Sequence, residues 1–177
     1  RLPQAGGASN PVLVDLDDLD EVLRPPQAPA DQAVPAPWPG VANGCLHQPG
    51  AAQVWAVQGK KGAAIQVELR AAMMGSRLDG ILSLVDEQGK EILAAETRAP
   101  ALDPAFSYTF PRDGPYVIKV RDRFANRAGP EFAYRLRLTQ PTAGPDLRLA
   151  LKTEALPLER GKTAKLTLQV ERRGFAQ

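Results

Sequence analysis

Apolar and polar side chains alternate with a period of two in short bursts between residues 40 and 140. Apolar residues stand at every second position over 65–69, 106–110, 116–120 and 132–138. A strand with this pattern buries one face and shows the other to water. Glycines and a turn that starts with proline, PRDGP at 111–115, separate the bursts. About eight strands at this spacing predict an all-β fold, an antiparallel β-sandwich of jelly-roll type.

Residues 77–93, RLDGILSLVDEQGKEIL, contain a cluster of acids that suggests either a calcium site or a hairpin. We favour the hairpin, because apolar residues at 81–85 and 92–93 flank the turn DEQG. In that turn Gly89 takes a positive φ at low cost, and Asp86 caps the turn through the backbone. Asp79 stands at the entrance of the first strand, where we expect it to hydrogen-bond a neighbouring loop.

The two flanks differ from this central region. Residues 25–39 contain six prolines, so we expect an extended linker there, with no helix and no central strand. Residues 1–24 end in the run VLVDLDDLDEVL, which we interpret as the tail of a preceding module. Alternation restarts at 147–151 and 166–170, and so residues 141–177 are expected to hold a linker and the first strands of a following module. Helix signal is weak, with at most one turn at 68–76, ended by Gly75.

Composition and charge exclude several classes of protein. The chain has 177 residues, of which 44% are hydrophobic and 24% charged, as in an ordinary globular protein. Its 22 basic and 20 acidic residues are mixed along the sequence and leave a net charge of +2. This distribution lacks the basic footprint of a nucleic-acid-binding protein. The sequence also has no apolar run long enough for a transmembrane helix.

Catalytic and metal-binding chemistry has few candidate residues. Cys45 is the one cysteine and His47 the one histidine, too few ligands for a structural zinc site. Residues at i and i+2 meet as a catalytic dyad only where a turn brings them together. The serines, for example Ser76, Ser83 and Ser107, lie outside any G-x-S-x-G motif. We therefore expect no enzyme activity, no metal and no cofactor.

Three other groups of residues suggest binding. The acidic run Asp15–Glu21 lacks the glycine of a calcium loop, and we interpret it as a solvated linker or strand edge. Trp55 is expected in the core, whereas Trp38 either stacks on a sugar or plugs the linker onto the sandwich. Five basic residues suggest a modest basic surface, but Asp113 and Asp122 stand among them, so we favour a mixed, solvated face. The basic residues are Lys60, Lys61, Arg121, Arg123 and Arg127. The polar loop at 121–129 is where a partner would bind.

Several blocks of the central region resemble the bacterial pre-peptidase C-terminal domain, a secreted β-sandwich module. The blocks are GVANGCLHQPG (40–50), WAVQGKKGAAIQVELRA (55–71), GSRLDGILSLVDEQGKEIL (75–93), LDPAFSYTFPRDGPYVIKVRD (102–122) and AYRLRL (133–138). The flanks are similar to pieces of immunoglobulin-like modules. Asp79 matches an acid of the family, but carboxylates usual in it are missing at AAQVW and AAET, and Asp31 alone stands in the linker. Calcium binding is therefore not carried over.

The resemblance implies a noncatalytic module of a larger exported bacterial protein. We expect it to act as a spacer, a folding aid or an adhesion and interaction unit, in the secreted, periplasmic or cell-surface space. Its expected partners are neighbouring modules of the same chain or surface proteins, without nucleic acid or membrane insertion. The alternative is a module that binds polysaccharide or matrix protein, aided by calcium, beside a secreted hydrolase. The residues of a ligand site stay unassigned at this stage.

Overall fold

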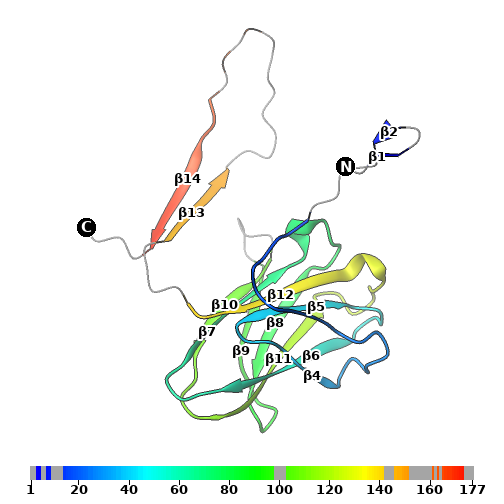
Figure 1. Ribbon diagram of the computed structural model, residues 1–177, viewed down its shortest axis with the longest axis vertical. Coiled ribbons are helices and arrows are strands. Elements are labelled where there is room, and N and C mark those ends of the chain that lie inside the picture. The colour runs from blue at the N-terminus through cyan, green and yellow to red at the C-terminus, as the bar shows by residue number, and fades with distance from the viewer. Residues whose placement is uncertain are drawn as a thin grey trace. The chain divides into compact units, whose positions relative to one another are not determined.

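The chain divides into two compact units, Arg1–Pro141 and Thr142–Gln177. The computed structural model describes residues 3–4, 7–8, 14–97, 103–141, 146–151, 161, 163 and 165–173. Within these residues the first unit contains two five-stranded sheets, and the second contains a two-stranded hairpin (Figure 1). No helix of the described residues is long and apolar enough to cross a membrane.

Two sheets face each other in the first unit. In spatial order, the first sheet contains β10 (Ala105–Thr109), β7 (Ala64–Arg70), β12 (Ala133–Thr139), β5 (Gly40–Cys45) and β3 (Glu21–Leu23). The second contains β4 (Ala33–Pro35), β6 (Ala52–Gly59), β11 (Gly114–Asp122), β8 (Gly80–Val85) and β9 (Glu91–Glu96). The strands from β5 to β12 pair antiparallel within their sheets. The predicted all-β sandwich of about eight antiparallel strands is confirmed.

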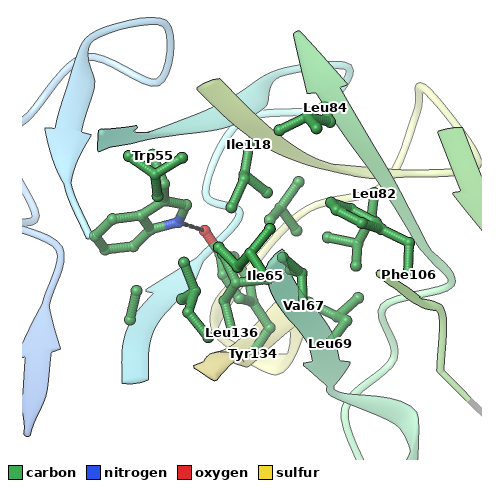
Figure 2. Close-up of a cluster of buried hydrophobic side chains, with 14 of the residues drawn as sticks. Trp55, Ile65, Val67, Leu69, Leu82, Leu84, Phe106, Ile118, Tyr134 and Leu136 are labelled. Atoms are coloured by element: carbon green, nitrogen blue, oxygen red, sulfur yellow. Dashed lines mark hydrogen bonds between the residues drawn. The ribbon is translucent and has the colours of Figure 1, made fainter. Parts of the chain in front are cut away.

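The core lies between the sheets and follows the predicted alternation. On β7, Ile65, Val67 and Leu69 are at most 2% exposed, and their odd-numbered positions place them on one face. The same alternation buries the core residues of β11 and β12. Figure 2 shows side chains of both sheets meeting in this layer. Each strand thus buries its apolar row and turns its polar row outward.

The hairpin predicted at 77–93 is present as β8 and β9. The backbone N–H groups of Gln88 and Lys90 donate to the Asp86 carboxylate at 3.0 and 2.9 Å. Gly89 has a φ of 80°, a conformation that residues with a side chain rarely adopt. The acids around this turn therefore belong to the hairpin, and the prediction that Asp86 caps the turn is confirmed.

The N-terminal flank contributes two edge strands, and one of them lies within the linker expected at 25–39. β4 forms within that proline-rich segment and pairs parallel with β6, while β3 pairs parallel with β5. Proline is tolerated on an edge strand because its missing N–H is not needed by a second neighbour. The segment is thus part of the sandwich at 33–35. That residues 1–24 end a preceding module stays a prediction.

The remaining strands lie outside the two large sheets. β1 (Pro3–Gln4) and β2 (Gly7–Ala8) pair with each other. β13 (Asp146–Leu151) and β14 (Leu168–Arg173) form the antiparallel hairpin of the second unit, with Leu149 opposite Val170. Leu149 is 62% exposed and Val170 46%. Two strands seldom hold a domain together alone, and that this hairpin starts a further module stays a prediction.

A hydrogen-bonded chain of side chains joins the two sheets inside the core. The indole N–H of Trp55, on β6, donates to the Tyr134 hydroxyl on β12 at 2.9 Å (Figure 2). That hydroxyl donates in turn to Oε1 of Gln53 at 2.7 Å, and the Gln53 amide donates to the carbonyl of Cys45 at 2.8 Å. Burial raises the pKa of Tyr134 far above its usual value, so the phenol stays protonated and able to donate.

Replacing Tyr134 with Phe tests this junction. The substitution leaves the buried indole N–H of Trp55 and the amide of Gln53 without their shared partner, so we expect the free energy of unfolding to fall by about 1–3 kcal/mol. Urea unfolding followed by tryptophan fluorescence measures the change. Tyr116→Phe is the matched control, because the Tyr116 hydroxyl makes only a long bond of 3.4 Å to the Arg112 carbonyl. Equal losses for the two variants would contradict the role of Tyr134.

Candidate functional site

A groove opens on the outer face of the first sheet, lined by residues of β5, β12 and the segments beside them. Its volume is about 580 Å³. The floor is formed by the paired ends of β5 and β12, where Cys45 lies opposite Ala133 and Asn43 lies opposite Arg135. On both strands these residues alternate with buried ones, so their side chains lie on the face of the sheet that points away from the core. Small side chains at 45 and 133 leave the space that larger ones would fill.

Irregular segments form the walls of the groove on either side of this floor. One side is formed by Leu23, Pro25 and Pro26, which continue from the edge strand β3. The other side is formed by two 3-10 turns, η1 (Ala72–Met74) and η2 (Pro130–Phe132), which follow β7 and precede β12. The walls are therefore mostly apolar, and they belong to loops placed by the strands at the floor. Ligand sites are commonly built in this way.

The wall at η1 is fixed by a carboxylate. The backbone N–H groups of Ala71, Ala72 and Met73 donate to the Asp103 carboxylate at 2.9–3.0 Å. Gly75 then ends the turn with a φ of 85°, as predicted for the weak helical segment at 68–76. Asp103 was not singled out in the sequence, because an acid that satisfies distant backbone groups leaves no local pattern.

The two wall turns are also tied to each other. The Ser76 hydroxyl and the Arg77 backbone N–H both donate to the carbonyl of Glu131, at 3.0 and 2.9 Å. These bonds join segments that lie more than fifty residues apart in sequence. The groove is thus preformed on this side, which lowers the entropy that a ligand has to offset on binding.

Cys45 and His47 both line the groove and lie side by side, an arrangement that the sequence analysis allows only where the chain turns between them. The Sγ of Cys45 lies 3.8 Å from Nδ1 of His47 and donates to the carbonyl of Gly129 at 3.2 Å. Burial raises the pKa of the Cys45 thiol, whereas a nucleophilic cysteine needs a lowered pKa. The pair therefore offers a polar contact, with the sulfur held as a neutral thiol.

Arg24 lines the groove, and backbone carbonyls surround its guanidinium. Its side chain is 4% exposed, and its guanidinium donates to the carbonyls of Val54, Pro29, Ala30 and Gln32 at 2.6–3.1 Å. It also lies over the Trp55 ring at 5.6 Å. Burial lowers the pKa of Arg24, and the carbonyls stabilise its charge. The effect is to fold the proline-rich segment onto the sandwich.

Of the two predictions for the acidic run, the strand edge holds at Glu21, which begins β3, whereas the residues before it lie on the outer face of the sheet and are not a solvated linker. We call residues 14–21 the acidic strap. Asp15 accepts from Arg70 at 2.8 Å, Asp17 from Arg137 at 2.6 Å, and Glu21 from Arg135 at 2.7 Å. The correction has a simple cause. Arginines from β7 and β12 share the outward face of the sheet, and only the fold brings them beside the strap.

Hydrogen bonds from arginine lower the pKa values of two acids of the strap. The bond from Arg137 lowers the pKa of Asp17 below its usual 3.8. The bonds from Arg135 and from the Asn43 amide lower the pKa of Glu21 below its usual 4.5. Both groups are thus charged in the folded chain at neutral pH.

The two tryptophans differ in burial. Trp55 is 0% exposed, as predicted for a core residue. Trp38 is half-buried, packs edge-on against Phe110 with the ring centroids 5.6 Å apart, and donates its indole N–H to the carbonyl of Thr139 at 3.2 Å. Of the two alternatives for Trp38, the structure supports the plug.

Two arginines of the loop at 121–129 are paired with acids of this chain. Arg123 donates to the Asp79 carboxylate at 3.1 Å, which agrees with the prediction that Asp79 bonds a neighbouring loop. Arg127 makes a two-point contact with Asp122 at 2.8 Å and lies over the Phe124 ring at 4.3 Å. The basic surface is therefore interleaved with acids. Among the described residues no group of three or more metal-ligating side chains is close enough to hold an ion.

Comparison with known proteins finds likeness only among solved structures. No family model and no curated protein matches the sequence. The pre-peptidase C-terminal domain of collagenase from Bacillus anthracis covers 63% of this chain with 99% of its own, at 10% identity and a TM-score of 0.49. The periplasmic inhibitor of g-type lysozyme from Aeromonas hydrophila covers 67% with 96% of its own, at 14% identity and a TM-score of 0.47. The first is a domain of the family that the sequence blocks resemble.

The strap predicts a loss of stability in acid. Because the folded pKa values of Asp17 and Glu21 lie below their usual values, their contribution is present above about pH 4.5 and is lost as the pH falls through the folded values. Unfolding by urea at pH 7 and at pH 3 measures the difference. We expect Asp17→Asn with Glu21→Gln to lower stability at pH 7 and to reduce the fall between the two pH values.

The exposed acids of the same strap provide the control for this prediction. Asp18 and Asp20 lie on the outward side of the strap, so Asp18→Asn with Asp20→Asn should leave the fall in stability between pH 7 and pH 3 close to that of the unchanged chain. If both double variants lose the same part of the pH dependence, the ion pairs of the strap are not its source.

Proposed function

We propose that this chain is a noncatalytic β-sandwich module of a larger exported bacterial protein, acting as a spacer and interaction unit that binds through the groove. The binding would rest on the fit between surfaces and not on bond making. The observation that carries the proposal is the groove itself, with its apolar walls, small floor residues and preformed sides. Such a hollow is suited to an apolar or neutral extended ligand.

The charges near the groove support a neutral ligand. Arg70 and Arg135, which line one end, are each engaged by carboxylates of the strap. Glu131, at the other end, lies 3.5 Å from Arg77. An anionic or cationic ligand would have to break these pairs, whereas an uncharged one would not. We therefore favour an aliphatic peptide segment of a neighbouring module or surface protein.

Catalysis is not favoured by the groups that line the groove. The Cys45 thiol has a raised pKa and donates to a carbonyl, and His47 at its side is exposed. Activated nucleophiles instead combine a lowered pKa with a base that is itself oriented. Export is supported by the resemblance of the sequence blocks to a secreted module, which suggests the extracellular or periplasmic space.

The polysaccharide alternative would need a contact other than Trp38. The edge-on packing of Trp38 on Phe110 and its bond to Thr139 fix it to the sandwich. The groove itself offers a sugar few aromatic faces among its described lining residues. An array that contains both glycans and extracellular matrix proteins separates these ligand classes.

The experiment fills the groove and asks whether binding is lost. Ala133→Phe places a large side chain on the floor, so we expect binding to peptide or protein spots of the array to fall at least about tenfold, because the ligand and the ring compete for one space. Ala94→Phe is the matched control, since Ala94 is also exposed on a strand but lies on β9 of the other sheet. Equal binding by both variants would overturn the groove as the site.

A further inference from the structure

Three arginines form a row on the outer face of the first sheet. We call Arg70, Arg135 and Arg137 the arginine row. Arg70 and Arg135 are directly opposite each other on β7 and β12, and Arg137 follows two residues along β12. Their side chains are only 14–27% exposed. Cations this far from water need a carboxylate partner, because an unpaired charge at such a site is costly.

The acidic strap supplies the carboxylates, and it does so with its acids toward the sheet and its apolar side chains toward water. Asp15 and Asp17 face the sheet with side chains 22% and 9% exposed. Val14 and Leu16 face outward, 75% and 88% exposed. A segment held by hydrophobic burial would show the opposite pattern. The strap is therefore attached by its charges.

The backbone contributes little to this attachment. Residues 14–20 form no strand, and the chain bends at 18–19 before β3 begins. The first backbone bond of the strap to the sheet is from the Val41 N–H to the carbonyl of Asp20 at 2.8 Å. The part of the strap that carries Asp15 and Asp17 is thus free to be exchanged without breaking a β-ladder.

The spacing of charges matches on the two sides. Asp15 and Asp17 are two residues apart, as are Arg135 and Arg137, and the Asp15–Arg135 and Asp17–Arg137 distances are 3.2 and 2.6 Å. An extended chain repeats its side chains every second residue. The row is therefore selective for an extended segment with acids at i and i+2.

We propose that the arginine row is a receptor surface for such a segment, and that the strap of a second copy of this chain takes it by exchange. Within one chain the strap has the advantage of a high effective concentration, so the exchange shows only when the strap and the row are uncoupled. This inference names one partner for the proposed interaction module, and it is probed with variants that leave Ala133 in place. Failure here and failure of the groove are therefore distinguishable.

The experiment uses two full-length variants that complement each other. Asp15→Asn with Asp17→Asn keeps the row but weakens its own strap. Arg135→Gln with Arg137→Gln keeps the acids, removes the arginine partner of Asp17 and leaves Asp15 with Arg70 alone. We expect each variant alone to sediment as a monomer, and an equimolar mixture to show a weight-average mass that rises toward twice that of the monomer. Circular dichroism of each variant confirms the folded state before mixing.

A second pair and a control make the outcome decisive. If either double variant unfolds, Asp17→Asn mixed with Arg137→Gln carries the same test on one ion pair. Asp18→Asn with Asp20→Asn, mixed with the arginine variant, should stay monomeric because its own strap still fills its row. A mixture of the complementary variants that stays monomeric at about 0.1 mM would overturn the proposal, as would equal association by the control.

Discussion

The hydrogen bond between Trp55 and Tyr134 is the contact on which the rest of the sandwich depends. It joins β6 of one sheet to β12 of the other in a core where each polar group must find a partner. Tyr134 also lies opposite Gly44 on β5, and a side chain at that glycine would collide with its hydroxyl. The network thus adds side-chain bonds to the backbone ladder that pairs β5 with β12 at the floor of the groove.

Around this centre, polar groups fasten segments that have little apolar surface to bury. Arg24 gathers four backbone carbonyls of the proline-rich segment and of β6, and Asp103 gathers three backbone N–H groups at η1. In each case a charged side chain, buried for Arg24 and half-buried for Asp103, takes the place of the regular backbone pairing that a strand or helix would give. The groove walls and the acidic strap are placed in the same way, so the surface proposed for binding depends on charges more than on hydrophobic burial.

Local sequence patterns predicted much of the fold, but they did not predict the groove or the contacts of the strap. The hairpin at β8 and β9 was predicted because Asp86 and Gly89 act on their own neighbours. The ion pairs of the strap were not predicted, since its acids meet Arg70 and Arg137 only after strands distant in sequence have paired. Trp38 stayed undecided for the same reason. For Cys45 and His47 the sequence left open whether a turn brings them together, and the chain after β5 places their side chains 3.8 Å apart.

The sequence by itself determined the strands, their buried faces and the turns between them, because alternation and turn chemistry act over a few residues. It also determined that the proline-rich segment would hold no central strand. Only the tertiary structure decided that β3 and β4 join the sheets as edges and that the strap lies on the arginine row. It also decided that a groove opens above Cys45 and Ala133. These features join residues that are far apart in sequence, so their energies appear only when the sheets have formed.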